Sequence, residues 1–159
     1  GDITQEDTKL ENQLILSWVK LSGLVKNSRI TVGLKYNEAI VMLALYNRYL
    51  ADGEGLTSIK DIIKETGMLK SLVNRTLGEL QSKGLITYQK GTADRRTKFV
   101  KCVKENLDVF LSVHNGSVKV AERIIDIIGE DDTKEFIKIV EKLSNAGYKT
   151  CPQSELKEK

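Results

Sequence analysis

The sequence predicts a mainly α-helical fold that carries one small β-hairpin. In most of the chain, apolar residues recur every three or four positions, which is typical of amphipathic helices. Two short segments, 85–90 (LITYQK) and 98–103 (KFVKCV), are instead rich in β-branched and aromatic residues, and the turn-forming stretch GTADRRT separates them. With 159 residues, of which 40% are hydrophobic and 30% charged, the chain is typical of one globular domain or one small intertwined unit.

Neither a membrane span nor a secretion signal is expected from the sequence. No apolar run approaches the roughly 18 residues needed to cross a bilayer, and the first residues are polar and acidic. Cys102 and Cys151 form no spacing motif, so we interpret both as reduced thiols. We therefore expect a cytoplasmic protein.

The first two predicted helices are strongly apolar. The segment 10–25 has a wide apolar stripe, which is typical of a helix that contacts more than one neighbour. The segment 38–50 is apolar on most sides, so we expect it at the centre of the fold, with Asn37 as its N-cap. The stretch 51–55 (ADGEG) then ends this helix.

Two shorter helices follow, and together they are typical of a helix-turn-helix. The first, 57–65, is capped by Thr57 or Ser58, and the second, 69–83, ends at Gly84. One side of the second helix is apolar, while its other side is polar and basic near the N-terminus, where a recognition helix reaches base edges. A packed helical hairpin with one solvated face would show the same pattern, so both interpretations stay open at this point. The predicted DNA-facing residues of this helix are Lys70, Ser71, Asn74 and Arg75.

The charged tip of the hairpin favours the first interpretation. A helix-turn-helix followed by a hairpin with a basic tip is typical of a winged helix, whose hairpin reaches the minor groove beside the recognition helix. Arginine is the side chain that fits a narrow, strongly negative minor groove. The predicted DNA-binding residues of this wing are Arg95, Arg96 and Lys98. The predicted fold class is therefore a winged helix-turn-helix with long N- and C-terminal helices.

The charge distribution agrees with a DNA-binding surface. The net charge of the chain is +3, but residues 60–104 carry eleven bases and four acids, for +7. The segments 1–59 and 105–159 carry −1 and −3. Phosphate binding concentrates positive charge in this way, and uneven surface charge without a ligand is the alternative.

Two helices complete the chain. Asn106 is the predicted N-cap of a long helix that ends before Gly129, and Asp132 or Thr133 is the predicted cap of a last helix to Leu143. These two helices and the first are too apolar for a winged helix of this size to bury, so we expect a second copy of the chain to cover them. The predicted organisation is a flexible N-terminus (1–9), an N-terminal dimerisation helix and connection (10–35), a winged helix-turn-helix (36–103), C-terminal dimerisation helices (104–145) and a flexible tail (146–159).

These patterns together resemble the MarR family of bacterial transcription regulators. The stretch SLVNRTLGELQSKGLI (71–86) is similar to the family's recognition helix and its exit. The run DRRTKFVKC (94–102) is similar to the family's wing, whose hallmark is Asp-x-Arg, here Asp94 and Arg96. The order of helices fits the family over nearly the whole chain, whereas the motifs cover residues 57–103.

The resemblance implies an obligate homodimer that binds a palindromic operator in double-stranded DNA. Members are usually repressors, and a small phenolic or other ligand often releases them. The resemblance also implies that Arg96 enters the minor groove and that Asp94 braces the wing through an ion pair with an arginine. A turn-forming role is the alternative for Asp94. Arg75 would contact a base, hold a phosphate or pair with Asp94.

The family's aromatic ligands bind between the dimer helices and the DNA-binding unit, and no other cofactor is expected. Plain core or interface positions are the alternative for each candidate. By rough placement, the candidates for such a pocket are Trp18, Tyr36, Tyr46 and Tyr49.

The sequence departs from the family pattern at three places. A polar cap is missing at Leu69, where the recognition helix begins. Cys102 and Val103 stand where the family usually has Leu-Thr, so we interpret Cys102 as a buried structural thiol and not as a sensor. The family's common arginine just before the wing is also absent, and Tyr88 and Lys90 occupy that region.

Other function classes fit the residues less well. The chain has no phosphate-cradling glycine motif, and its one histidine, His114, lies on a core-facing stripe. A Ser-His-Asp or Cys-His site and a metal cluster are therefore not expected, and an enzyme is not predicted. The stronger alternative is a winged helix that binds other proteins without specific DNA binding. Such modules often lack the basic recognition face and wing arginines that this chain keeps.

Overall fold

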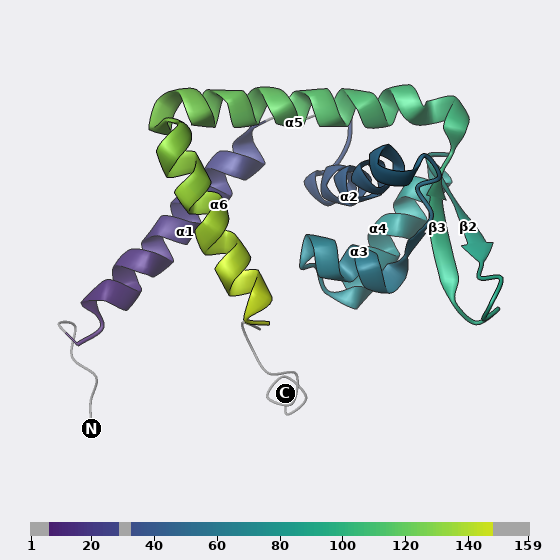
Figure 1. Cartoon of the computed structure of the whole chain (residues 1–159), viewed down its shortest axis with the longest axis horizontal. Helices are drawn as coiled ribbons and strands as arrows, with labels where there is room; N and C mark the ends of the chain where they lie inside the picture. The colour runs from purple at the N-terminus through teal and green to yellow at the C-terminus, as the bar shows by residue number, and fades with distance from the viewer. Residues whose placement is uncertain (1–6, 29–32, 148–159) are drawn as a thin grey trace. The chain divides into compact units, whose positions relative to one another are not determined.

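The computed structural model describes residues 7–28 and 33–147, which form helices and one small sheet. The predicted tail from 148 onward, Cys151 included, lies outside the described residues. The chain divides into two compact units within one helix, after Val118. The elements are α1 (Lys9–Asn27), α2 (Tyr36–Asp52), β1 (Thr57–Ser58), α3 (Ile59–Thr66), α4 (Lys70–Ser82), β2 (Ile86–Lys90), β3 (Lys98–Cys102), the 3₁₀ turn η1 (Lys104–Asn106), α5 (Leu107–Ile128) and α6 (Glu130–Asn145). Figure 1 labels the helices and the strands β2 and β3.

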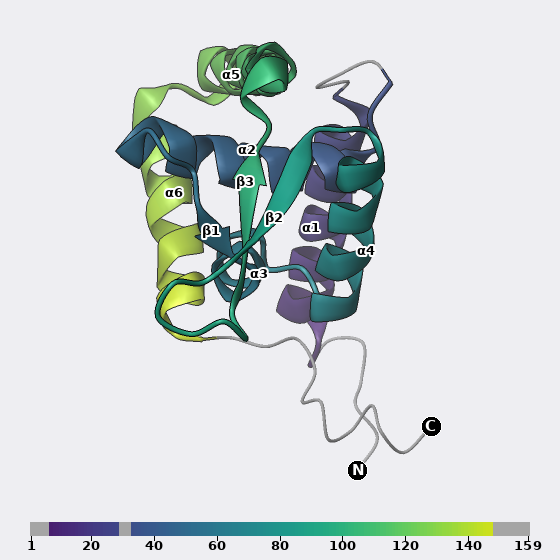
Figure 2. The ribbon, with the colours of Figure 1, turned by 90° about the vertical axis from the view of Figure 1, so that its right-hand side faces the viewer.

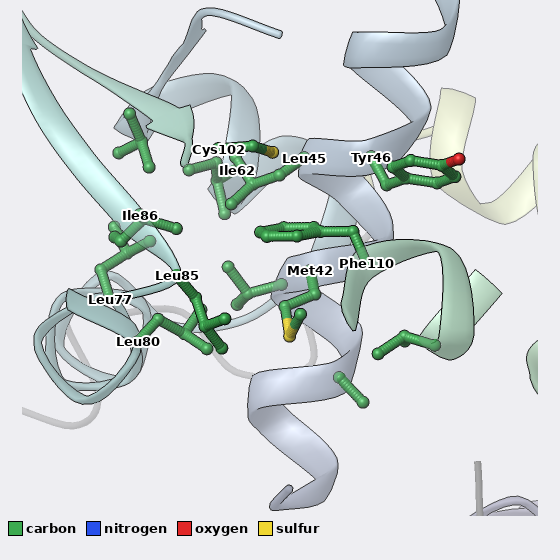
Figure 3. Packing of buried hydrophobic residues seen from close by; sticks show 14 of the residues in the cluster. Met42, Leu45, Tyr46, Ile62, Leu77, Leu80, Leu85, Ile86, Cys102 and Phe110 are labelled. Carbon is green, nitrogen blue, oxygen red and sulfur yellow. The ribbon is translucent and has the colours of Figure 1, made fainter. Parts of the chain in front are cut away.

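The core of the first unit lies between α2, the helix-turn-helix, the sheet and the start of α5. The central position predicted for the second helix is confirmed, because Val41, Met42 and Leu45 are fully buried. Phe110 and Val113 attach the first turns of α5 to the same cluster. Figure 3 shows the side chains of Met42, Leu45 and Phe110 converging within it. Burying this apolar surface fixes the elements that carry the basic residues in one arrangement.

The N-terminus of α2 differs from the prediction. Lys35, not Asn37, is the N-cap residue, and α2 begins at Tyr36. The backbone N–H of Lys35 donates to Glu38 Oε1 at 2.9 Å, so a glutamate three residues into the helix satisfies the cap from within. The Asn37 prediction was wrong because residue preference at a cap does not reveal which residue leaves the helical backbone conformation.

The helix-turn-helix agrees with the prediction. Ser58 caps α3, and its Oγ accepts a hydrogen bond from the Asp61 backbone N–H at 3.1 Å. Gly67, with a φ of +69°, ends α3 in the left-handed conformation that favours glycine. Three residues separate the end of α3 from the start of α4. Helix α4 is closed where expected, with the Leu85 backbone N–H donating to the Leu80 carbonyl at 3.0 Å.

The sheet contains one strand more than predicted. Strand β1 pairs with β3, so the order is β1-β3-β2 and β3 lies in the middle (Figure 2). Thr57 therefore belongs to a strand and not to the following helix, where the prediction had placed it. Two residues are too few to give a period-2 pattern, so the sequence carries no signal for β1. The consequence is mechanical: the wing is hydrogen bonded to the strand that leads directly into α3.

The entry into α5 also differs in detail. Asn106 immediately precedes α5, as predicted for its cap, but lies in the 3₁₀ turn η1. Its side-chain amide donates to the Gly84 carbonyl at 2.8 Å. The end of α4 is therefore tied to the segment that leaves the wing.

Helices α1 and α6 contain no buried residue in the described structure. Helix α6 begins at Glu130 with Gly129 as its N-cap residue, so neither Asp132 nor Thr133 caps it. The Thr133 hydroxyl instead donates to the Gly129 carbonyl at 2.7 Å. Large apolar side chains such as Leu10, Trp18 and Phe136 are exposed on these helices. In the described part of the chain, no helix is both long and apolar enough to span a membrane.

Candidate nucleic-acid interface

The exposed face of α4 holds all four residues predicted to face DNA. Lys70, Ser71, Asn74 and Arg75 are exposed, while Val73, Leu77 and Leu80 on the opposite side are fully buried. Arg75 forms no ion pair with any described residue, so the pair with Asp94 considered above is not present. A guanidinium without an internal partner on this face is available to an external anion or base edge.

The residue at the N-cap of α4 is unusual for that position. Leu69 is the N-cap residue, its side chain makes no cap hydrogen bond, and it is 67% exposed. The absence of a polar cap predicted from the sequence is therefore confirmed. The first backbone N–H groups of α4 carry the positive end of the helix dipole and have no side-chain acceptor at this position.

A tight turn forms the tip of the wing. The Thr97 backbone N–H donates to the Asp94 carbonyl at 3.1 Å, which places Arg95 and Arg96 at the two central positions of a four-residue turn. Gly91 closes the loop below it, because its backbone N–H donates to the Thr97 carbonyl at 2.9 Å. Both arginines are exposed. The turn therefore presents two guanidinium groups side by side along the chain at the end of the hairpin.

Asp94 combines the two roles that the sequence left open. One carboxylate oxygen, Oδ1, accepts the Arg96 backbone N–H at 3.0 Å, which is a turn-forming contact. The same oxygen lies 3.4 Å from Arg96 Nε, which is an ion pair with a wing arginine. Arg96 is the arginine held by the brace.

Charged and aromatic side chains also meet at the base of the wing. The ammonium of Lys98 lies 5.7 Å from the centre of the Tyr88 ring, within reach of a cation–π contact. Burial raises the pKa of the Tyr88 hydroxyl above its usual value. Lys98 and Lys90 face each other in the ladder between β2 and β3. Two lysines therefore flank the strand ends just below the arginine turn.

Acidic residues near this surface are neutralised from within the domain. All four acids of residues 60–104 lie in ion pairs: Asp61 and Glu65 with Arg48, Glu79 with Lys35, and Asp94 with Arg96. Of the eleven bases in the same segment, eight have no ion pair within the described part of the chain. These eight are Lys60, Lys64, Lys70, Arg75, Lys90, Arg95, Lys98 and Lys104. The surface that results has an excess of positive charge without internal partners.

Ion pairs made by two residues of α2, Glu38 and Arg48, support the site and were not found from the sequence. Glu38 on α2 is fully buried and pairs with Lys83 at the end of α4, with Nζ 2.8 Å from Oε2. Burial alone raises the pKa of the Glu38 carboxyl, but hydrogen bonds from Lys83 and the Lys35 backbone hold it below its usual value. Arg48, also on α2, lies 3.5 Å from Asp61 and 3.6 Å from Glu65. The paired residues are far apart in sequence, and one sequence gives no signal of such contacts.

The four candidates for an aromatic pocket do not behave alike. The Tyr46 and Tyr49 rings stack with centres 6.1 Å apart, and Phe110 and His114 lie 6.5 and 5.4 Å from Tyr46. Trp18, by contrast, is 54% exposed, and Tyr36 is also exposed. Neither joins the buried cluster that contains Tyr46.

Cys102 and His114 have the structural positions expected for them. Cys102 is 5% exposed within the core, and burial raises the pKa of its thiol to about 11. A thiol of this kind carries almost no thiolate near neutral pH and is unreactive. His114 is half-buried against Tyr46. Among the described residues, no three His, Cys, Asp or Glu side chains come close enough to hold a metal ion.

Helix-turn-helix, three-stranded sheet and basic hairpin together define a winged helix-turn-helix protein. Residues 32–97, from just before α2 to the tip of the wing, match a family model described as MarR family. This match confirms the resemblance that the motifs in α4 and the wing predicted. Comparison with curated protein sequences gave no significant match.

Solved structures share the fold over nearly the whole chain. AbsC, a MarR family transcriptional regulator from Streptomyces coelicolor, is 16% identical with a TM-score of 0.72, covering 92% of this chain and 97% of its own. Sco3205 from the same organism, solved in complex with DNA, is 12% identical with a TM-score of 0.71, covering 92% and 90%. BpsR from Bordetella bronchiseptica, whose DNA binding 6-hydroxynicotinic acid regulates, is 14% identical with a TM-score of 0.70, covering 91% and 98%. At these identities the likeness shows a shared winged-helix fold.

Proposed function

We propose that this chain is a dimeric, sequence-specific DNA-binding transcriptional regulator, and that it is a repressor released by a small molecule. The observation that carries the proposal is the charge arrangement of the winged helix. Every acid of residues 60–104 has an ion-pair partner, whereas eight bases on and around α4 and the wing have none among the residues that the structure describes. Such an excess favours a polyanion, because each phosphate that a base neutralises releases counterions.

The proposed contacts divide between the two grooves. Ser71, Asn74 and Arg75 face the major groove, where amide and guanidinium groups pair with the edges of adenine and guanine. Arg95 and Arg96 at the wing tip face the minor groove. Lys70 and Lys98 contact the backbone phosphates, which position the protein without reading sequence.

The exposed apolar faces support a homodimer. Helices α1 and α6 have no buried residue, and the part of α5 after Val118 exposes Ile124, Ile125, Ile127 and Ile128. Monomeric proteins rarely expose this much apolar surface. A second copy of the chain is the simplest cover, and it implies an operator with two-fold symmetry.

The small molecule that we propose as effector is an aromatic or phenolic compound. The rings of Tyr49 and His114 both contact Tyr46, and these three are the residues we propose to contact an effector. An aromatic or phenolic compound suits such a lining. The regulation of BpsR by 6-hydroxynicotinic acid, a small aromatic acid, supports an effector of this class.

The test is a binding titration against two duplexes over a series of salt concentrations. One duplex is the intergenic DNA upstream of the protein's own coding sequence, and the other has a random sequence of equal length. We expect tight binding to the first, two chains per site, and a steep loss of affinity as salt rises. Equal and weak binding to both duplexes at all salt concentrations would contradict sequence-specific regulation.

A protein-interaction module is the second candidate. It would leave the bases of α4 and the wing without a nucleic-acid partner, and DNA binding would be absent even at low salt. Capture of a protein on the immobilised chain, with no DNA retained, would favour it.

A further inference from the structure

One ion pair, between a fully buried carboxylate and a partly exposed ammonium, joins the recognition helix to α2. The Glu38 carboxylate is fully buried, and it accepts hydrogen bonds from the Lys83 ammonium (2.9 Å to Oε1) and the Lys35 backbone N–H (2.9 Å). The Lys83 ammonium also lies 2.8 Å from Oε2 of the same carboxylate. Lys83 is the C-cap residue of α4, so the contact holds the C-terminal end of the helix. The residues proposed to contact DNA lie at its N-terminal end.

A second ion pair reinforces the first one turn away. The Lys35 ammonium lies 3.3 Å from Glu79 Oε1, and Glu79 precedes Lys83 by four residues on α4. The two pairs have opposite polarity. Glu38 on α2 is the acid that pairs with Lys83, while Lys35, the N-cap residue of α2, is the base that pairs with Glu79. Each of the inner charges also suits its helix end: Glu38 lies in the first turn of α2 and Lys83 at the C-terminus of α4. In the observed register each of these charges lies beside a partner of opposite sign on the other element.

Burial of the Glu38 carboxylate gives the Glu38–Lys83 pair a directional character that apolar contacts lack. The Lys83 ammonium is partly exposed, so the pair adds little net stability: desolvation of the carboxylate offsets much of the attraction. Its geometry is nevertheless strict, because displacement of Lys83 leaves the buried charge with only the hydrogen bond from the Lys35 backbone N–H. Leu77 and Leu80, which also hold α4, tolerate small sliding and rotation because dispersion contacts are not directional.

We propose that Glu38 and Lys83 are positioning residues for DNA recognition: their ion pair, anchored by the buried Glu38 carboxylate, fixes the orientation of α4, and hence sequence selectivity. The proposal rests on the proposed function. Helix α4 has 13 residues, so its length is about 20 Å at roughly 1.5 Å per residue. A small rotation at Lys83 therefore moves Ser71 and Asn74, at the far end, by a larger distance. Contacts to base edges need accurate placement, whereas contacts to phosphates tolerate displacement.

The experiment compares binding to two duplexes for three proteins. One duplex is selected from a random-sequence library by the wild-type protein, and the other is an unselected duplex of the same length. The variants are Glu38→Gln, which keeps the shape of residue 38 and frees the Lys83 charge, and the double variant Glu38→Gln with Lys83→Met. The double variant has the net charge of the wild type, so a change in binding cannot come from total charge.

We expect both variants to lose about tenfold in the ratio of selected to unselected affinity, the size of one lost base contact. Affinity for the unselected duplex should stay unchanged in the double variant and stay equal or rise in Glu38→Gln, because phosphate contacts remain. A merely structural role would leave the ratio unaltered in folded protein, as judged by helix content and cooperative unfolding. If Glu38→Gln does not fold, the double variant, in which residues 38 and 83 are both neutral, carries the test.

The outcomes separate this inference from the proposed function. A wild-type protein that selects no duplex from the library contradicts the proposed function itself. A wild-type protein that selects one, together with folded variants whose ratio changes less than threefold, overturns the positioning role alone. As a rescue, Lys83→Arg keeps a cation within reach of Glu38 and should retain the wild-type ratio.

Discussion

The Asp94 carboxylate holds Arg96 by two contacts, to its backbone N–H at 3.0 Å and to its side-chain Nε at 3.4 Å. The backbone contact shapes the turn, while the ion pair lies on an exposed surface, where such pairs contribute little stability. We propose that this weak pair aids DNA binding. It orders the guanidinium before DNA arrives, and a phosphate or a base edge can replace it without a large loss.

The first prediction concerns Arg96. Arg96→Ala should weaken binding to the operator by about 1–3 kcal/mol if the side chain enters a groove. Its free energy of unfolding should stay within about 0.5 kcal/mol of the wild-type value, because the residue is exposed. Titrations of operator DNA and urea unfolding measure the two quantities. Lys119→Ala, which removes an exposed base outside the winged helix, is the control. Unchanged operator affinity in Arg96→Ala would remove this residue from the interface.

The second prediction concerns Gly91 at the base of the wing turn. A methyl group there would lie 2.7 Å from the Asp94 carbonyl oxygen and 3.0 Å from the Phe99 ring. Because backbone must move to relieve this contact, Gly91→Ala should distort the turn and destabilise the fold by about 1–3 kcal/mol. Operator affinity should also fall, since the same turn carries Arg95 and Arg96.

Gly78→Ala is the matched control for this change. Gly78 lies within α4, and nothing outside its own helix comes within 4 Å of an added methyl group. The same substitution there should raise the free energy of unfolding by about 0.5–1 kcal/mol, because alanine favours the helix. Urea unfolding of both variants gives the sign of each effect. Destabilisation by both substitutions, or by neither, would contradict the steric argument at Gly91.

Much of the fold could be predicted from the sequence because periodicity and turn residues are local properties. The stripe in α4, its closure at Gly84 and the two hairpin strands follow from patterns within a few residues. The basic face and the arginine turn were predictable for the same reason. The family motifs then placed these local signals in one arrangement.

The remainder depends on contacts between distant residues. Strand β1 exists because Thr57 meets Val100 across the sheet, and Lys35 caps α2 because Glu38 is held by Lys83, 45 residues away. Arg48 neutralises Asp61 and Glu65 only because α2 packs on α3. The local sequence pattern around each of these residues does not indicate its distant partner, so one sequence cannot predict the pairs.

The third prediction uses the uncapped start of α4. Leu69 already has the extended backbone of a cap residue, with φ −64° and ψ 146°. Leu69→Ser should therefore supply an acceptor for the N–H of Ser71 or Leu72 and raise the free energy of unfolding by about 1 kcal/mol. Leu50→Ser is the control, because Leu50 is 55% exposed but lies inside α2. An equal effect of the two changes in urea unfolding would mean that loss of an exposed apolar group, and not capping, is responsible.

The last prediction concerns pH and Cys102. Burial raises the pKa of this thiol from 9.0 to about 11, so both the folded and the unfolded chain carry a neutral thiol below pH 9. Above pH 9 the unfolded chain ionises first, which favours unfolding. The free energy of unfolding should therefore fall by about 1.4 kcal/mol per pH unit between the two pKa values.

Tyr88, whose pKa is also raised, adds to the same alkaline loss, so the wild-type slope alone does not isolate the thiol. Cys102→Ala removes only the thiol contribution and should show a shallower slope by this amount. Equal slopes in urea unfolding of the two proteins from pH 8 to pH 11 would place Cys102 in contact with solvent.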